Sequence, residues 1–178
     1  MWGSMIKGQL IGLRAIEPED LPILLEWRNN PENRKYFREW RELNSQHQTE
    51  WFENHVLSES SPVMFAIVAL EDGTLLGACG LTYIDWVHRN SEISIYIGKG
   101  YLDDVVAPEA LDLLVNYGFS EAGLHRLFIR VYDYDLKRHA LARQAGFTLE
   151  GMMKDAHFCG GKFHHECIYG LLGGGGNA

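Results

Sequence analysis

The run HFCGGKFHHEC, from His157 to Cys167, concentrates three histidines and two cysteines, which are common zinc ligands. Zinc ribbons and fingers place such ligands in pairs at fixed spacings, and this run lacks the paired spacing. The Cys-Gly-Gly-Lys at its centre lies between two β-rich segments, which is typical of a hairpin turn. We therefore expect a terminal β-hairpin here and no metal site.

A second segment of chemical interest is IGKGYLDDVVAPEAL, Ile97 to Leu111, which has the pattern of a strand end, a loop and a helix start. Backbone N–H groups at a helix start can bind phosphate when small residues let the ligand approach. This loop instead carries Asp103 and Asp104, and an aspartate at such a position caps a helix by accepting the same N–H groups. The residues leave both interpretations open: a phosphate-binding loop and a capped helix without a ligand.

Length and charge limit the domain count and the partners. The chain has 178 residues, of which 46% are apolar and 22% charged, and we expect one domain over residues 1–172 with a flexible glycine-rich tail over 173–178. The net charge of -8 disfavours binding to nucleic acid and to anionic membranes, because both are polyanions. A neutral or cationic partner is easier to accommodate.

Apolar runs and cysteines indicate the compartment. No apolar run approaches the roughly 20 residues that span a bilayer, and MWGSMIKG lacks the apolar block of a secretory signal. The three cysteines are odd in number and irregularly spaced, which fits a reducing environment better than a disulfide framework. We expect a cytoplasmic protein without membrane association.

The elements that position these residues follow from periodicity. Apolar alternation predicts seven strands: Gly8–Ile16, the two arms of Val63–Trp86 around Glu71–Thr74, Ser91–Gly98, His125–Asp135, Phe147–Phe158 and Lys162–Leu172. Helical spacing predicts four helices, from Leu21 to about Asn30, from Ser45 to Leu57, from Val105 to Ala122 and from Leu136 to Gly146. Strands that alternate with helices and then form a hairpin predict a mixed sheet with helices packed on it.

This order resembles the GNAT superfamily of acyl-CoA N-acyltransferases, in particular the branch that acetylates ribosomal-protein N-termini, polyamines and amino sugars. The resemblance runs from LIGLRAIEPEDLPILLEWRNNPENR through GACGLTYIDWVHRNSEISIYIGK to AGFTLEGMMKDA and the closing IYGLL. It implies an α/β fold of mixed α+β type. The implied sheet is mostly antiparallel and seven-stranded, with a splayed central strand pair and about four flanking helices.

The resemblance also implies where acetyl-CoA, the expected cosubstrate, would bind. The pantetheine arm would pair with exposed backbone in a V-shaped cleft between Glu92–Gly98 and Leu127–Asp133, and the diphosphate would lie on the loop before the long middle helix. The residues implied to contact acetyl-CoA are Ile95, Tyr96, Ile97, Val105, Val106, Ala107 and Asp135.

The implied reaction is acyl transfer to a primary amine of a small molecule, an amino sugar or a protein N-terminus. Such an amine must attack unprotonated, and Glu92 matches the glutamate that this branch places at the start of the splayed strand, so Glu92 is the expected general base. The expected acceptor-binding residues are Arg28, Asn29, Tyr83, Asp85, Trp86 and Arg89. The connector NRKYFREWREL is either a partly buried link or a substrate-contacting loop.

Several positions depart from the family pattern. The loop reads Asp103-Asp104-Val105-Val106 where small residues are expected, and Asp135 replaces the family's asparagine. The family's tyrosine, which often protonates the leaving thiolate, is Ala142 here, and no replacement among Tyr132, Tyr134 and His139 is assigned. Two hypotheses follow: an N-acyltransferase, with a homodimer as the default assembly, or a noncatalytic ligand-binding or assembly module of this fold that has lost phosphate binding.

Overall fold

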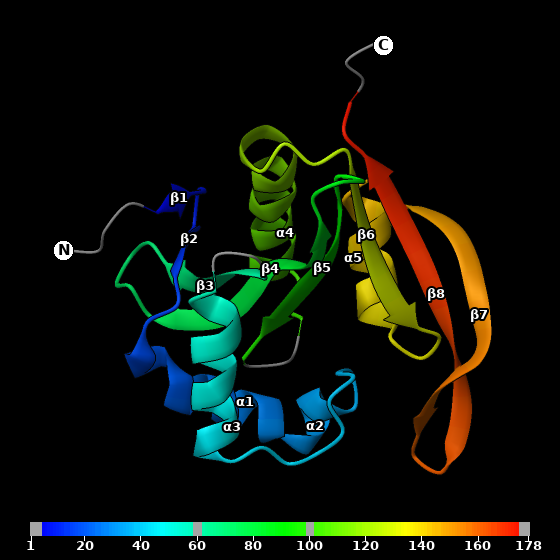
Figure 1. Ribbon diagram of the computed structural model, residues 1–178, viewed down its shortest axis with the longest axis horizontal. Helices are drawn as coiled ribbons and strands as arrows, with labels where there is room; N and C mark the ends of the chain where they lie inside the picture. Colours follow the sequence, from blue (N-terminus) through cyan, green and yellow to red (C-terminus); the bar gives the residue numbers. More distant parts are fainter. Residues whose placement is uncertain (1–4, 59–61, 99–101, 175–178) are drawn as a thin grey trace.

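One mixed sheet organises the molecule in the computed structural model (Figure 1), which describes residues 5–58, 62–98 and 102–174. The strand order is β1-β2-β3-β4-β5-β6-β8-β7, and every neighbouring pair is antiparallel except β5 and β6. The strands are β1 (Ile6–Lys7), β2 (Ile11–Ala15), β3 (Val63–Ala69), β4 (Leu75–Asp85), β5 (Asn90–Ile97), β6 (Arg126–Tyr132), β7 (Thr148–Cys159) and β8 (Lys162–Leu172). The predicted mixed, mostly antiparallel sheet is confirmed.

The helices lie in two groups (Figure 1). One group comes before β3 in the chain, and the other lies beside the central strands β5 and β6. They are α1 (Leu21–Asn29), α2 (Pro31–Arg34), α3 (Ser45–Trp51), α4 (Val106–Asn116) and α5 (Leu136–Gln144). The segments Phe52–Val56 and Tyr117–Glu121 continue α3 and α4 as π-helical turns. Helix α4 contacts β2, β4 and β5, while α5 contacts α4 and β6. No helix in the described ranges is long and apolar enough to cross a membrane.

The counts differ slightly from the expected seven strands and four helices. The additional strand, β1, has only two residues, which is too short for an alternating pattern. The additional helix, α2, begins directly after α1 because Asn30 caps it by accepting the N–H of Glu32, with Pro31 in its first turn. Asn30-Pro31 therefore ends α1 and starts α2, whereas the sequence predicted only the end of a helix there.

The expected hairpins are confirmed at both turns. Gly73 adopts a φ of 77° between β3 and β4, and Gly160 and Gly161 adopt φ of 59° and 81° between β7 and β8. The run with three histidines and two cysteines thus folds as a hairpin. Among the described residues, no group of three or more histidine, cysteine, aspartate or glutamate side chains is placed to hold a metal ion.

The central parallel strands separate after a short paired stretch. Strand β5 pairs with β6 only from Asn90 to Glu92, opposite Arg126 to Phe128. Beyond Glu92 the two strands diverge, and Figure 1 shows the opening between them. On β5, Ile93, Ile95 and Ile97 are almost fully buried in the core. The strand is therefore fixed by its packing although its edge toward β6 is unpaired beyond Glu92.

The glycine-rich tail predicted over 173–178 is only partly covered. Gly173 and Gly174 follow β8 outside any strand or helix, and residues 175–178 lie outside the described ranges. Residues 99–101, which belong to the loop before α4, are outside them too.

Candidate active site

A cavity of about 560 Å³ lies where β5 and β6 separate. It is bounded by the connector after α2, by β4, β5, β6 and β8, and by the start of α5. Its lining residues are Arg28, Tyr36, Phe37, Arg38, Glu39, Trp40, Arg41, Thr82, Tyr83, Glu92, Ile93, Ser94, Arg130, Tyr132, Asp135, Arg138 and Glu166. The connector therefore contributes to the cavity wall.

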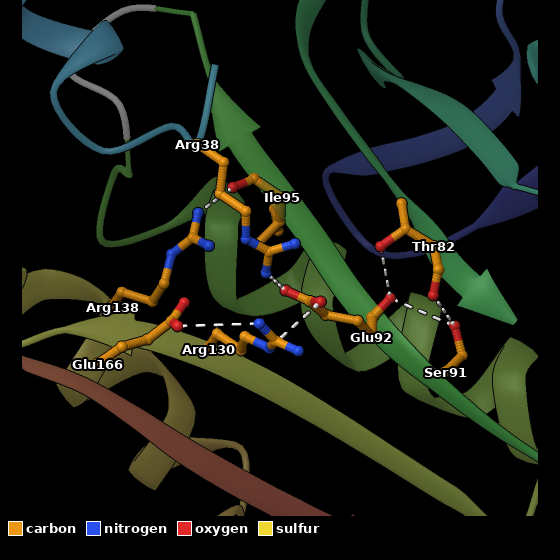
Figure 2. Close-up of polar contacts among 8 residues, drawn as sticks. All are labelled: Arg38, Thr82, Ser91, Glu92, Ile95, Arg130, Arg138 and Glu166. Atoms are coloured by element: carbon orange, nitrogen blue, oxygen red, sulfur yellow. Dashed lines mark hydrogen bonds and ion pairs between the residues drawn. The ribbon is translucent and has the colours of Figure 1, made fainter. Parts of the chain in front are cut away.

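Glu92 is held rigidly at the point of divergence. Its backbone carbonyl accepts hydrogen bonds from the hydroxyls of Thr82, at 3.2 Å, and Ser91, at 3.3 Å (Figure 2). Its side chain is 7% exposed and forms an ion pair with Arg38. The second carboxylate oxygen, Oε2, is buried without a hydrogen bond among the described residues, and it lies 3.8 Å from Nε of Arg130. A buried carboxylate with one such oxygen at a cavity wall suits proton abstraction.

A second buried carboxylate, Glu166 on β8, faces the same cavity. Arg130 lies between the two acids, with its Nη1 atom 3.8 Å from Oε2 of Glu166 (Figure 2). Burial raises the pKa of Glu166 above its ordinary value, although the charges of Arg130 and Arg38 oppose this shift. The sequence analysis did not select Glu166, Arg130 or Arg38. The sequence did contain a signal for Glu166, which is a charged residue within the apolar-rich run of β8. A charged residue in such a run is rarely buried without a partner, so it indicates a polar site.

Of the three candidates for a proton donor, only Tyr132 lines the cavity. Burial raises the pKa of Tyr132 to about 12, so its hydroxyl keeps its proton at neutral pH. Tyr134 instead donates a 2.5 Å hydrogen bond to the carbonyl of Lys35, and Nδ1 of His139 lies 2.8 Å from the hydroxyl of Tyr169. Ala142 is completely buried in α5.

The exposed edge of β5 partly fits the predicted binding of a pantetheine arm. Ile95 offers its carbonyl into the opening, where Nη2 of Arg138 donates to it at 2.7 Å (Figure 2). Tyr96 is buried against Phe37, with ring centroids 5.2 Å apart, and Ile97 packs in the core. An incoming amide would therefore compete with Arg138 for the Ile95 carbonyl.

Two N–H donors at the start of α4 are already engaged. Oδ1 of Asp103 accepts the N–H groups of Val105, at 2.8 Å, and Val106, at 2.5 Å. Val105 is exposed and Ala107 is buried. Nζ of Lys137 on α5 donates to the carbonyl of Leu102 at 2.8 Å, which brings a cation to this loop. A diphosphate that used these N–H groups would have to displace the Asp103 carboxylate.

The predicted acceptor residues separate into two groups. Arg28 and Tyr83 line the cavity, and Tyr83 adopts a φ of 50° at the irregular end of β4. The other four, Asn29, Asp85, Trp86 and Arg89, are not part of the cavity lining.

Three of those four residues have contacts that fix the backbone. The amide of Asn29 exchanges hydrogen bonds with the main chain of Leu43, Asp85 accepts the N–H of His88 at 2.8 Å, and Nε of Arg89 donates to the carbonyl of Gly123. Trp86 is half exposed beside them.

Asp135, predicted to contact the cosubstrate, lines the cavity and also caps α5 by accepting the N–H of Arg138 at 3.1 Å. Its carboxylate lies 3.6 Å from Nε of Arg138. It thus orients the arginine that reaches the β5 edge.

Comparison with known proteins agrees with this geometry. The spermidine N(1)-acetyltransferase of Escherichia coli K12 is 27% identical over 168 residues, which cover 93% of this chain and 89% of that protein. Two solved structures show the same fold. The spermidine N-acetyltransferase of Vibrio cholerae, solved with CoA and spermine, has a TM-score of 0.85 and 23% identity, covering 92% of this chain and 96% of that one. RimL, the ribosomal L7/L12 α-N-protein acetyltransferase solved with coenzyme A, has a TM-score of 0.84 and 17% identity, covering 95% and 98%.

The family assignment rests on a match over most of the chain and does not depend on any single local motif. Residues 11–148 match the family described as the acetyltransferase (GNAT) domain, and this range contains the separated strands, Glu92 and the loop before α4. The chain therefore belongs to the GNAT family of acetyltransferases.

Proposed function

We propose that this protein transfers an acetyl group from acetyl-CoA to a primary amine of a small molecule, an amino sugar or a protein N-terminus. The observation that carries the proposal is the buried carboxylate of Glu92, which lies at the divergence of β5 and β6 and faces a cavity. The relatives named above act on spermidine and on a ribosomal protein, which supports an amine acceptor.

The protein's own residues divide the work of the reaction. The acceptor nitrogen must lose a proton before it attacks, and Glu92 is the general base in this proposal. Thr82 and Ser91 hold the Glu92 backbone in place. Tyr132 keeps a proton at a hydroxyl beside the same cavity and is the candidate acid. Acetyl-CoA would supply the activated thioester.

The binding of acetyl-CoA would involve two regions. The edge of β5 around Ile95 would hold the pantetheine arm, and the start of α4, with Lys137 from α5, would hold the phosphates. A cytoplasmic location and a homodimer remain parts of the proposal, as the sequence favours them.

The alternative, a noncatalytic module, is favoured by one observation. Asp103 already occupies the N–H groups of Val105 and Val106 at the start of α4. Calorimetric titration with acetyl-CoA, followed by a thiol-release assay with a panel of amines, separates the two functions. We expect micromolar binding and acceptor-dependent release of CoA. The absence of binding at millimolar acetyl-CoA would support the module instead.

A further inference from the structure

The charge of the cavity differs from that of the whole protein. The chain has a net charge of -8, yet the cavity lining contains five arginines and four carboxylates, with no lysine among its residues. A cationic pocket on an acidic protein concentrates anionic ligands, because low-dielectric walls focus the local field. This is an unexpected property for a pocket that would receive only polyamines.

Four of the five arginines already have carboxylate neighbours. Arg38 pairs with Glu92, and Arg130 lies 3.8 Å from both Glu92 and Glu166. The remaining two pairs, at 2.7 Å and 3.6 Å, are Arg41 with Glu39 and Arg138 with Asp135.

Arg28 is the exception. In the part of the chain that the structure describes, its guanidinium makes no ion pair within 4 Å and no hydrogen bond, and its Nε atom is buried. The pKa of Glu39 is lowered chiefly by its direct partner Arg41, and the charge of Arg28 contributes to the same shift. Its Cζ atom lies 5.3 Å from the centre of the Phe37 ring, which orients the planar group at the cavity wall. A guanidinium presents several donors in one plane and matches carboxylate or phosphate geometry. Arg28 is therefore placed to receive an anion from a ligand.

We propose that the acceptor is a small amine that also carries an anionic group, a carboxylate or a phosphate, and that Arg28 binds this group. The inference rests on the proposed function, since it specifies that reaction's acceptor. The ammonium of such a molecule can take the place of Arg38 beside Glu92, and Arg38 can then share the anion with Arg28. After this exchange Glu92, Arg38 and Arg28 all have partners of opposite charge, which matters because unpaired buried charges are costly.

A polyamine lacks this complementarity. Its first ammonium would also compete with Arg38 for Glu92, but it would bring no anion for Arg38 or Arg28. Its further charges would then add to an already cationic lining. The structure therefore favours zwitterionic or anionic amines over spermidine-like acceptors.

Binding to the free protein tests the inference directly. Calorimetric titration would compare 3-aminopropylphosphonate and β-alanine with propylamine, which has the same amine and no anionic group, and with spermidine. We expect the phosphonate or the carboxylate to bind at least about tenfold more tightly than propylamine. If propylamine or spermidine binds as tightly as the better anionic compound, the proposal is wrong.

Two substitutions assign the effect to Arg28. Arg28→Gln should abolish the advantage of the anionic compounds, and Arg28→Lys should retain part of it because the charge remains. Arg34→Gln is the matched control, since Arg34 lies on α2 outside the cavity lining and contacts Glu42. Circular dichroism melts show whether each variant is folded. An unchanged advantage in folded Arg28→Gln contradicts the assignment.

Turnover separates this inference from the proposed function. Acetyl transfer would be measured for propylamine against 3-aminopropylphosphonate and for glucosamine against glucosamine 6-phosphate. Including β-alanine also shows whether Arg28 prefers a carboxylate or a phosphate as the anionic group. Tight anionic binding without any acetyl transfer would retain the anion site and remove the transferase. If acetyl transfer is faster for the amine without an anionic group in each pair, the proposed transferase function stands and the proposed anion site at Arg28 is wrong.

Discussion

Two acidic side chains in one cavity have different surroundings. Glu92 and Glu166 both approach Arg130, but only Glu92 also forms an ion pair with Arg38. For Glu166, desolvation by burial has the largest effect on the pKa and raises it. A pair of carboxylates whose environments differ can serve separate purposes in proton transfer.

Replacing the expected base changes turnover more than binding. Glu92→Gln keeps the size of the side chain and its contact with Arg38 but cannot accept a proton, so we expect kcat to fall by about a hundredfold or more. The Kd for acetyl-CoA, measured by calorimetry, should change little. Glu42→Gln, at an exposed glutamate outside the cavity, is the control. Unchanged kcat in Glu92→Gln would exclude this residue as the base.

Glu166 predicts a pH dependence of stability. A carboxyl whose pKa is raised by folding is favoured in its neutral form, so its contribution to stability is present below its unfolded pKa and is lost as pH rises through the folded pKa. Glu166→Gln stays neutral at every pH. The variant should therefore melt at a higher temperature than the wild type at pH 8, with a difference that shrinks toward pH 4.5. A lower melting temperature of the variant at pH 8 would show that the pair with Arg130 outweighs desolvation.

The start of α4 connects helix stability with ligand binding. Asp103 satisfies two N–H groups that a phosphate would otherwise use, and Glu109 on the same helix accepts the N–H of Leu10 at 2.9 Å beside β2. The helix is thus fixed at both its start and its flank without any ligand. The Asp103 carboxylate, which stabilises the start of α4, would therefore also compete with the phosphates of the cosubstrate.

Removing the cap should shift that balance. Asp103→Ala should lower the free energy of unfolding by about 1 kcal/mol, because the N–H groups of Val105 and Val106 lose their acceptor. The same change should tighten acetyl-CoA binding severalfold, as measured by calorimetry. Asp104→Ala is the control, because it removes the same charge from an aspartate that makes neither of the two cap hydrogen bonds. It therefore measures how much of the gain in affinity comes from charge alone. Equal gains in affinity in both variants would show that charge alone, and not N–H occupancy, limits binding.

Periodicity was sufficient to predict most elements. The alternation of Ile93, Ile95 and Ile97 and the helical spacing of Leu111 and Leu114 correspond to buried positions in the structure. The sequence could not indicate how far β5 and β6 stay paired, because strand separation depends on packing between distant segments. The short elements β1 and α2 were missed because two or four residues carry no period.

The site was less predictable than the fold. Glu92, Arg28, Tyr83 and Asp135 were selected from the sequence, and all four line the cavity. The partners Arg38 and Arg130 come from a connector and from β6, which only the tertiary structure brings together. Single residues on alternating strands give no local sign of which face meets a cavity formed by other elements.

The sheet consists of two parts with little backbone pairing between them. Strands β1 to β5 and strands β6, β8 and β7 are joined through Asn90–Glu92 opposite Arg126–Phe128. Side-chain contacts add to this junction. Arg138 donates to the carbonyl of Ile95 (Figure 2), and Tyr134 donates to the carbonyl of Lys35. A ligand arm between β5 and β6 would contact both parts at once.

Acetyl-CoA should therefore stabilise the molecule on heating. A ligand that binds only the folded state at about 100 times its Kd adds about 2.7 kcal/mol, which corresponds to a rise in Tm of roughly 5–10 °C for a chain of this size. Differential scanning fluorimetry would measure it. The control is 3′-phosphoadenosine at the same concentration, which has no pantetheine arm and cannot bridge β5 and β6, so its shift should be clearly smaller. An equal shift from both compounds would mean that the opening between the strands contributes nothing to binding, because the arm would then add no affinity.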